Sequence, residues 1–338
     1  MDSKSRFLNA LSFKEVDRIP VIPQLTYAAA KWSDMNIDEA LNNGGKQLKA
    51  LLYAQEECGY DGIYAGWEGS FVLLSSTLGS KLQVFKDKPP NVHKPLINSK
   101  EDLKKIQTLN PKKDGRIPIN LKLIKELKKK SEVPILSYLP APFTLSGLLH
   151  STEKLMLLIY MDMDFLNQLV DLCFNLIYIF GKAKIEAGVD AITIADPTGS
   201  SDMISPKHFE ELSFPSLKEL ITKLKKDGAK VGLHICGNTR PILHLMADTG
   251  ADYLEVDQAV DLKDARMEAE KTCIFGNIGT SELLSESKEN IIELSKNCIE
   301  KIGDKGYILS SGCEVPYGTP IENIQAMVET VIKHKKAL

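Results

Sequence analysis

The sequence has almost no excess of charge of either sign. Its 338 residues include 42 Lys and Arg and 45 Asp and Glu, which gives a formal net charge of −3. Nucleic-acid-binding surfaces need a basic patch or stripe, and here the short lysine runs fall between periodic segments or near the end of the chain. The composition therefore gives no support for binding to nucleic acid.

Apolar runs of membrane-spanning length are also missing. The most apolar segment, around Leu155 to Phe180, is interrupted by three aspartates and an asparagine, which predicts a buried helix and not a membrane span. The first residues, 1–6, lead into a short amphipathic piece without the apolar core of a signal peptide. We expect a cytoplasmic protein that does not associate with membranes.

Cysteine is scarce and widely spaced. Six cysteines are spread over more than two hundred residues, which in a cytosolic protein favours free thiols or metal ligands over a disulfide scaffold. Four of them fall in expected helices or at a strand start, and we interpret these as packing residues. They are Cys58, Cys173, Cys273 and Cys298.

One local pattern recurs along the chain: a helical stretch, a glycine, an aspartate two residues later and then a β-rich run. It occurs as EECGYDGIYAGW (56–67), IEAGVDAITIAD (185–196) and MADTGADYLEVD (246–257). The glycine suits the left-handed residue that ends a helix, and the apolar run suits a buried parallel strand. Alternation of helix and strand indicates repeated βα units.

The expected strands number about eight. They cover residues 18–24, 62–67, 133–139, 191–196, 230–236, 253–257, 273–278 and 307–313. Eight parallel strands in a chain of this length predict a (β/α)8 TIM barrel, here one domain over residues 1–338 with N-terminal helical additions within about 1–130. An open doubly wound sheet is the alternative, although no GxGxxG follows the first strand.

Active sites of such barrels lie at the carboxyl ends of the strands. The residues expected there form a polar, metal-competent set, which is drawn from segments far apart in sequence. They are Gln24, Trp67, Glu68, Tyr138, Asp196, His234, Cys236, Asp257, Asn277 and Cys313.

Within this set, His234 and Cys236 stand two residues apart on one expected strand, so both side chains face the same way. Cys313 ends the last expected strand. One imidazole and two thiolates suit Zn²⁺ and leave a fourth position open, as in catalytic zinc sites. Asp257, at the end of the neighbouring strand, could fill that position in the absence of substrate.

Other interpretations of these residues stay open. The histidine could be a hydrogen-bonded core residue with two small buried cysteines beside it, or the zinc could be structural. Asp196, in IADPTGSSDMISP (194–206), is equally compatible with a turn cap and with a contact to substrate or cofactor.

Four stretches resemble the uroporphyrinogen decarboxylase superfamily and, within it, the methylcobamide:coenzyme M methyltransferases. The resemblance covers most of the C-terminal half, while the N-terminal third is similar only in outline. The stretches are AITIADPTGSSDMISP (191–206), LHICGNTRPILHLMADTGADYLEVD (233–257), FGNIGTSELL (275–284) and LSSGCEVPYGTPIENIQAMV (309–328).

The resemblance implies a zinc ion bound by His234, Cys236 and Cys313. An acidic ligand of the thiol-free state falls on Asp257, where the related chain carries glutamate. Gln24, Asp196 and Asn277 become candidates for contacting the corrinoid or the thiol, and Arg240 for meeting the sulfonate of coenzyme M. The decarboxylases carry an arginine-rich motif where this chain reads PQLTYA (23–28), so porphyrinogen carboxylates would lack their cations.

The reaction that this resemblance implies is transfer of a methyl group from a methyl-Co(III) corrinoid to a thiol, with coenzyme M as the expected acceptor. Zinc would ionise the thiol at neutral pH. The chain has no DxHxxG motif for binding a corrinoid itself, so a separate small corrinoid protein is the expected partner.

Four alternatives remain. The acceptor could be homocysteine or another small thiol. The enzyme could instead demethylate a substrate onto the corrinoid, although the carboxylate-rich zinc pattern of such relatives is not found here. It could be a decarboxylase, which the missing arginines disfavour, or a non-catalytic partner of a corrinoid protein with a structural zinc.

Overall fold

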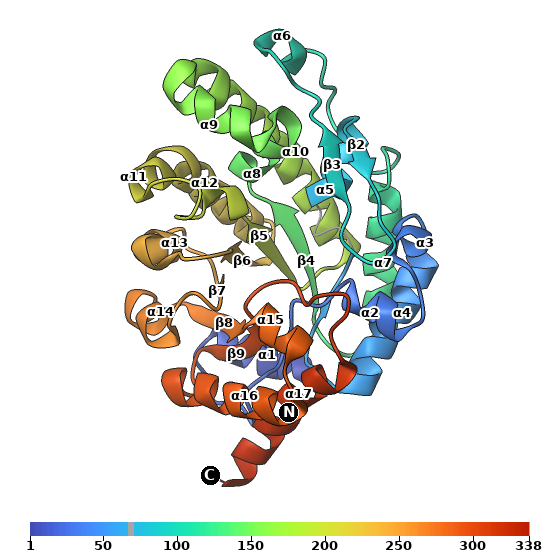
Figure 1. Ribbon diagram of the computed structural model, residues 1–338, viewed down its shortest axis with the longest axis vertical. Coiled ribbons are helices and arrows are strands. Elements are labelled where there is room, and N and C mark those ends of the chain that lie inside the picture. Colours follow the sequence, from blue (N-terminus) through green and yellow to red (C-terminus); the bar gives the residue numbers. More distant parts are fainter. Residues whose placement is uncertain (67–70, 338) are drawn as a thin grey trace.

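The computed structural model describes residues 1–66 and 71–337, and its main sheet curls into a barrel surrounded by helices (Figure 1). All neighbouring strands of this sheet are parallel. In spatial order they are β1 (Ile63–Tyr64), β4 (Ile135–Pro140), β5 (Ala191–Ala195), β6 (Lys230–Ile235), β7 (Tyr253–Val256), β8 (Cys273–Ile278) and β9 (Tyr307–Ser311).

The segment between β9 and β1 closes the barrel. The strand predicted over 18–24 is reduced there to a single parallel bridge between Val21 and Leu309. The strand is irregular because Pro20 and Pro23 have no backbone N–H to donate to a regular ladder of hydrogen bonds. The remaining groups still pair, since Ile22 N donates to Leu309 O at 3.0 Å. The fold is thus a (β/α)8 TIM barrel, as the sequence predicts, with an irregular first strand.

The recurring Gly-Xaa-Asp pattern has a structural cause at the amino ends of the strands. The glycine takes a left-handed conformation after its helix, for example φ +104° at Gly188. The aspartate carboxylate then accepts a hydrogen bond from a backbone N–H at or near the start of the adjacent strand, which ties neighbouring βα units together. The three bonds join Val21 to Asp61, Ile135 to Asp190 and Val231 to Asp252, each at 2.9 Å.

Most of the additions to the barrel lie before β4, as predicted. They include an antiparallel hairpin, which we did not expect from the sequence, made of β2 (Lys81–Gln83) and β3 (Asn91–Lys94). The helices of this part are α1 (Ser3–Leu11), α2 (Ala28–Trp32), α3 (Ile37–Leu41), α4 (Gly44–Cys58), α5 (Phe71–Leu78), α6 (Lys100–Leu103) and α7 (Ile117–Lys130).

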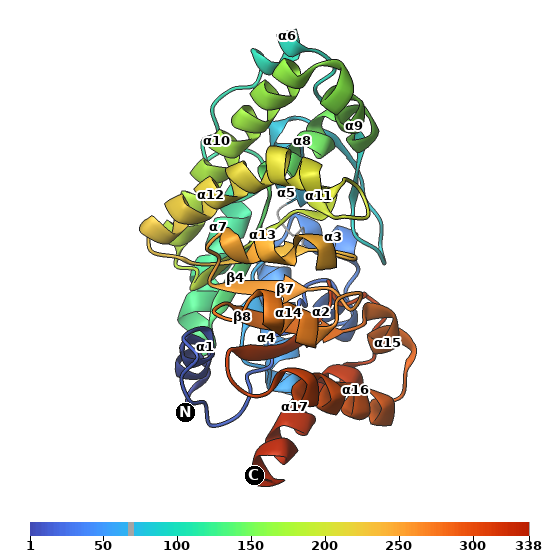
Figure 2. The ribbon, with the colours of Figure 1, turned by 90° about the vertical axis from the view of Figure 1, so that its left-hand side faces the viewer.

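The second half of the chain alternates strands with covering helices. Figure 2 shows α1 at one end of the barrel and α11 and α15 at the other. The helices after β4 are α8 (Pro142–His150), α9 (Thr152–Met161), α10 (Met163–Ala187), the 3₁₀ helix η1 (Pro197–Gly199), α11 (Pro206–His208), the π-helix η2 (Phe209–Ser213), α12 (Phe214–Lys226), the 3₁₀ helix η3 (Arg240–Ile242), α13 (Leu243–Asp248), α14 (Leu262–Glu268), α15 (Thr280–Ser285), α16 (Lys288–Ile302) and α17 (Ile321–Ala337).

The apolar helix predicted around Leu155 to Phe180 is two helices. Asp162 divides it, because its carboxylate caps the start of α10 by accepting from Phe165 N at 3.0 Å. By length and composition alone, α10 could cross a membrane, although 44% of its most apolar window is buried inside the protein. Its packing against α7, α8, α9 and α12 is that of a barrel helix.

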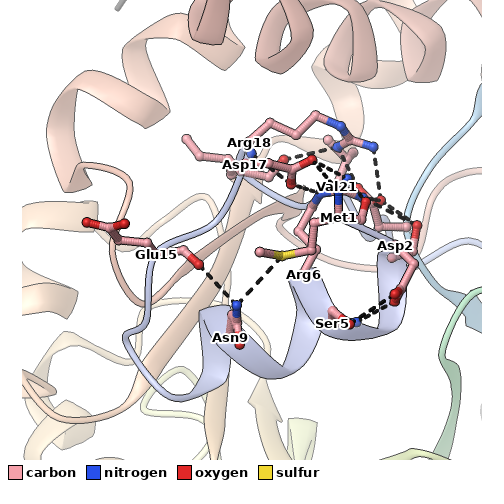
Figure 3. Close-up of polar contacts among 12 residues, drawn as sticks. Met1, Asp2, Ser5, Arg6, Asn9, Glu15, Asp17, Arg18 and Val21 are labelled. Atoms are coloured by element: carbon pink, nitrogen blue, oxygen red, sulfur yellow. Dashed lines mark hydrogen bonds and ion pairs between the residues drawn. The ribbon is translucent and has the colours of Figure 1, made fainter.

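A buried ionic cluster lies where α1 meets the start of β1. Figure 3 shows Arg6 and Arg18 close together beside Asp17. Both arginines bind Asp61, which is fully buried, at 2.6 Å. Arg6 also binds Asp17 at 2.7 Å. The cluster therefore fixes the N-terminal helix to the closing segment at the amino end of the barrel.

Candidate metal centre

Three predicted ligands meet at the carboxyl end of the barrel. His234 lies on β6, Cys236 follows that strand directly, and Cys313 follows β9 by two residues. His234 Nε2 is 3.0 Å from Cys236 Sγ and 3.7 Å from Cys313 Sγ, and the two sulfurs are 3.4 Å apart. The imidazole is buried and both thiols are half-buried.

This triangle suits a single metal ion. With ordinary Zn–N and Zn–S bonds, two ligands of a tetrahedral Zn²⁺ lie roughly 3.5–4 Å apart. The observed separations of 3.0 to 3.7 Å need only small movements to reach that arrangement. The donor set of one nitrogen and two sulfurs is also the type that Zn²⁺ prefers. The donor atoms of these three residues therefore fit Zn²⁺ in both type and separation.

The orientation of His234 is fixed by its other ring nitrogen. Nδ1 lies 3.2 Å from the backbone carbonyl oxygen of Glu255 on β7, which can only accept a hydrogen bond. Nδ1 therefore carries the proton, and in the neutral ring the lone pair of Nε2 points to the two sulfurs. A hydrogen bond of this kind is the usual means of orienting a histidine that binds a metal.

Cys313 is in an environment that disfavours a bare thiolate. The hydrogen bond with Cys236 and burial raise the pKa of its thiol well above the ordinary value. A cation among the three donors reverses this effect, because a thiol that coordinates a metal ion is deprotonated and its proton is released to water. Cys313 therefore suits a cation-binding role better than a role as a free nucleophile.

Two glycines let the surrounding loops approach the cluster. Gly237 has φ +80°, and a Cβ there would lie 2.1 Å from Asp202 Oδ2. That carboxylate accepts from Asn238 N at 3.0 Å, so the loop after β5 holds the turn that follows Cys236. A Cβ on Gly312 would lie 2.7 Å from Gln258 N. These close approaches hold the segment that carries Cys236 against the loop after β5, and the segment that carries Cys313 against the loop after β7.

Asp257 is not brought into the cluster. Among the described residues, the group whose ligand atoms all lie within 4.8 Å of one another contains His234, Cys236 and Cys313 alone. The Asp257 carboxylate instead accepts from Ala259 N at 2.9 Å, in the turn after β7. To act as the predicted fourth ligand, the Asp257 carboxylate would have to move toward the three donors.

Asp196 is used by the fold. It is fully buried and accepts from Thr144 Oγ1 at 2.6 Å and Ser213 Oγ at 2.5 Å, so it ties β5 to α8 and to the π-helix η2. Burial raises the pKa of this carboxyl. The side chain makes no cap hydrogen bond to the turn η1 that follows, so the turn-cap interpretation does not describe these contacts, in which the carboxylate joins separate elements of the fold.

The side-chain amides of Asn277 and Gln24 also form hydrogen bonds inside the protein. Asn277 Nδ2 donates to Asp257 O at 2.9 Å and to Val260 O at 2.7 Å, which shapes the loop after β7. Gln24 is buried and bonds to Tyr138 and Ser311. Neither side chain presents its amide nitrogen to a ligand in this arrangement.

The three remaining candidates are one largely exposed arginine and two residues outside the described part of the chain. Arg240, a candidate for the sulfonate, is largely exposed and pairs with Asp264 on α14 at 2.7 Å. Trp67 and Glu68, which the sequence also places at a strand end, lie outside the residues that the structure describes.

The sequence interpretation missed a polar group inside the barrel, centred on Glu255. This fully buried carboxylate accepts hydrogen bonds from Tyr64, Thr193 and Tyr138, and Oε2 lies 3.8 Å from Nδ1 of His234. A signal was available, because a lone glutamate stands inside the apolar run YLEV (253–256). Such a residue requires partners, and tyrosines on other inward-facing strand positions supply them.

A TIM barrel with an imidazole and two thiols converging at its carboxyl end is an enzyme scaffold with a metal-binding donor set. The family model described as "Uroporphyrinogen decarboxylase (URO-D)" matches residues 2–334. The chain therefore belongs to the uroporphyrinogen decarboxylase family, as the resemblance predicts.

Several relatives that are matched over nearly their whole length are named as methyltransferases. A methylcobamide:CoM methyltransferase MtbA of Methanosarcina acetivorans is 29% identical over 98% of both chains. A methylated-thiol–coenzyme M methyltransferase of Methanosarcina mazei is 28% identical, over 88% of this chain and 78% of that one. A solved methyltransferase structure from Methanosarcina mazei superimposes with a TM-score of 0.90 at 27% identity and covers 99% of both chains. The chain is accordingly a methyltransferase.

Proposed function

We propose that the protein transfers a methyl group from a methylated corrinoid, carried by a separate small protein, to a thiol, with coenzyme M as the first candidate acceptor. The observation that carries the proposal is the convergence of His234 Nε2 and the sulfurs of Cys236 and Cys313 within 4.8 Å. The names of the relatives, which include both methylcobamide and CoM, support it.

The three donors would hold a zinc ion. When bound there, Zn²⁺ would lower the pKa of a substrate thiol that enters its remaining position. The chain contributes the donor set, and it fixes the tautomer of His234 through the Glu255 carbonyl. Burial of the imidazole and half-burial of the thiols limit the access of water to the same point.

The bond changes of the reaction need no acid or base on the methyl carbon. The acceptor sulfur forms the new S–C bond as the Co–C bond breaks. The electron pair of the Co–C bond stays on the cobalt, which passes from Co(III) to Co(I). The proton of the thiol leaves to solvent. Transfer of this kind depends mainly on holding the sulfur, the methyl carbon and the cobalt in line.

The test is demethylation of methylcobalamin by the zinc-loaded protein with a panel of thiols. We expect conversion to the Co(I) corrinoid with coenzyme M, and homocysteine serves as the competing acceptor. X-ray absorption at the zinc edge, before and after addition of thiol, should show a sulfur replacing a lighter ligand. A zinc site that takes up no thiol, together with no demethylation, would indicate a structural zinc and contradict the proposal.

A further inference from the structure

We infer that Glu255, Tyr138 and Gln24 are positioning residues that hold His234 and the Cys313 segment in register with each other; the inference rests on the proposed zinc site. None of the three contributes a donor to the cluster of described residues. Their hydrogen bonds instead form a continuous path beneath it, from the strand of one ligand to the strand of another.

The path begins at His234. Its Nδ1 donates to the backbone oxygen of Glu255, so any shift of this residue moves the imidazole. The Glu255 side chain is in turn fixed by hydroxyl groups from three other strands. Thr193 on β5 lies 2.7 Å from Oε1, Tyr64 on β1 binds the same oxygen, and Tyr138 on β4 lies 3.2 Å from Oε2.

The path continues from Tyr138 to β9. The single proton of the Tyr138 hydroxyl is shared between Gln24 Oε1, at 3.0 Å, and Glu255 Oε2, at 3.2 Å, so this hydroxyl bridges the two side chains. Gln24 then donates twice to Ser311, through its backbone N to Oγ at 3.0 Å and through Nε2 to the carbonyl oxygen at 3.4 Å. Ser311 is the last residue of β9 and stands two residues before Cys313.

Every member of this path is at least nine-tenths buried. A hydrogen bond in such surroundings has no water to replace it, so losing one bond loosens the geometry it maintains. Because residues that orient metal ligands typically change metal affinity by about 10–100-fold when they are mutated, the same range is expected here. Tyr138 is the most informative position for mutation, since its hydroxyl joins the Glu255 side of the path to the Gln24 side.

The experiment compares Tyr138→Phe with the unmodified protein. The variant removes the hydroxyl and keeps the ring, which stacks on Tyr64 with centroids 4.6 Å apart. We expect the affinity for Zn²⁺, measured by competition with a chelator, to fall about 10–100-fold. In the Co²⁺-substituted variant, the thiolate-to-cobalt absorption band should weaken because Cys313 is held less well. Glu255→Gln should give the same direction of change.

The matched control is Tyr60→Phe. Tyr60 is also fully buried, but its hydroxyl has no hydrogen-bond partner in the part of the chain that the structure describes. This control should leave zinc affinity and the cobalt spectrum unchanged. A Tyr138→Phe protein with lowered thermal stability but unchanged zinc affinity and cobalt spectrum would overturn this inference and leave the proposed function standing. Unmodified protein that binds no zinc would overturn the proposed function, and this inference with it.

Discussion

At the scale of single residues, the side chains that offer donor atoms to a metal ion differ from those that only pack in the core. His234, Cys236 and Cys313 converge although Cys236 and Cys313 are 77 residues apart in sequence. The other four cysteines are buried, and burial raises their pKa values, as expected for packing residues. Thiol chemistry is therefore concentrated at one place in the described chain.

Replacing Cys313 by serine should remove one thiolate donor. We expect the affinity for Zn²⁺ to fall by at least about 100-fold, because each ligand carries a share of the binding free energy of the whole site. Methyl transfer should fall with it. Chelator competition measures the affinity, and Cys236→Ser should behave alike.

The control for this prediction is Cys173→Ala. Cys173 is fully buried in α10, so the change should lower the free energy of unfolding and leave zinc binding intact. Equal zinc affinity in the Cys313→Ser and Cys173→Ala variants would show that Cys313 is not a ligand.

The convergence of the three predicted donors could be expected from the sequence, because strand alternation and strand ends are properties of local pattern. His234 and Cys236 must face the same way on an extended strand. The sequence predicts Asp196, Asn277 and Gln24 less well, since the competing partners of each side chain come from distant segments. Asp196, for example, is engaged by Ser213 of a π-helix whose widened turn has no clear sequence signature.

At the scale of elements, the turn after β6 depends on its glycine. Gly237→Ala should lower zinc affinity, because the new Cβ strains a left-handed residue and displaces Asp202 from the turn that carries Cys236. The expected change is about tenfold, at the lower end of the range for residues that support a metal ligand. Calorimetric titration with Zn²⁺ measures it.

Gly228→Ala provides the comparison. Gly228 also has a positive φ of +105°, but a Cβ there would meet nothing within 4 Å. The two variants should thus share the backbone cost of about 1–2 kcal/mol and differ in zinc affinity. If both retain full affinity, the turn after Cys236 tolerates movement and the prediction is wrong.

The attachment of α1 should give a characteristic dependence on pH. The hydrogen bond from Arg6 holds the pKa of Asp17 well below its ordinary value of 3.8. The pair therefore stabilises the folded state above the unfolded pKa, and this stabilisation is lost as the pH falls below about 4. Urea unfolding of the unmodified protein and of Asp17→Asn should show a constant difference at neutral pH that shrinks in acid. A difference that persists unchanged in acid would exclude the ion pair as its source.

Element prediction from sequence succeeded where periodicity was uninterrupted. Seven of the expected strands occur within a few residues of their predicted bounds, whereas residues 18–24 form only a bridge because of their prolines. The hairpin of β2 and β3 was not expected, since its strands are short and mostly exposed and lack an apolar alternation. The division of the long apolar helix depended on the capping by Asp162, which hydrophobicity alone does not reveal.

At the scale of the whole molecule, Asp61 joins the N-terminal helix, the closing segment and β1. Asp61→Asn would leave Arg6 and Arg18 without their shared buried counter-charge, so we expect the free energy of unfolding to fall by about 3–5 kcal/mol. Denaturant unfolding measures the change. Glu293→Gln, which breaks an exposed pair with Lys296, should have no measurable effect. Similar stabilities for the two variants would contradict the central role of Asp61.

The junction between the first and last strands also sets an order in time. Synthesis releases the segment around Val21 long before its partner Leu309 and the predicted ligand Cys313, which follow much later in the chain. Contacts between such distant residues form late and slowly, because a long loop must close before they are gained. A chain made only as far as β8 can present His234 and Cys236 but not the third donor. Stable metal uptake is therefore expected only once Cys313 has been synthesised and the barrel has closed.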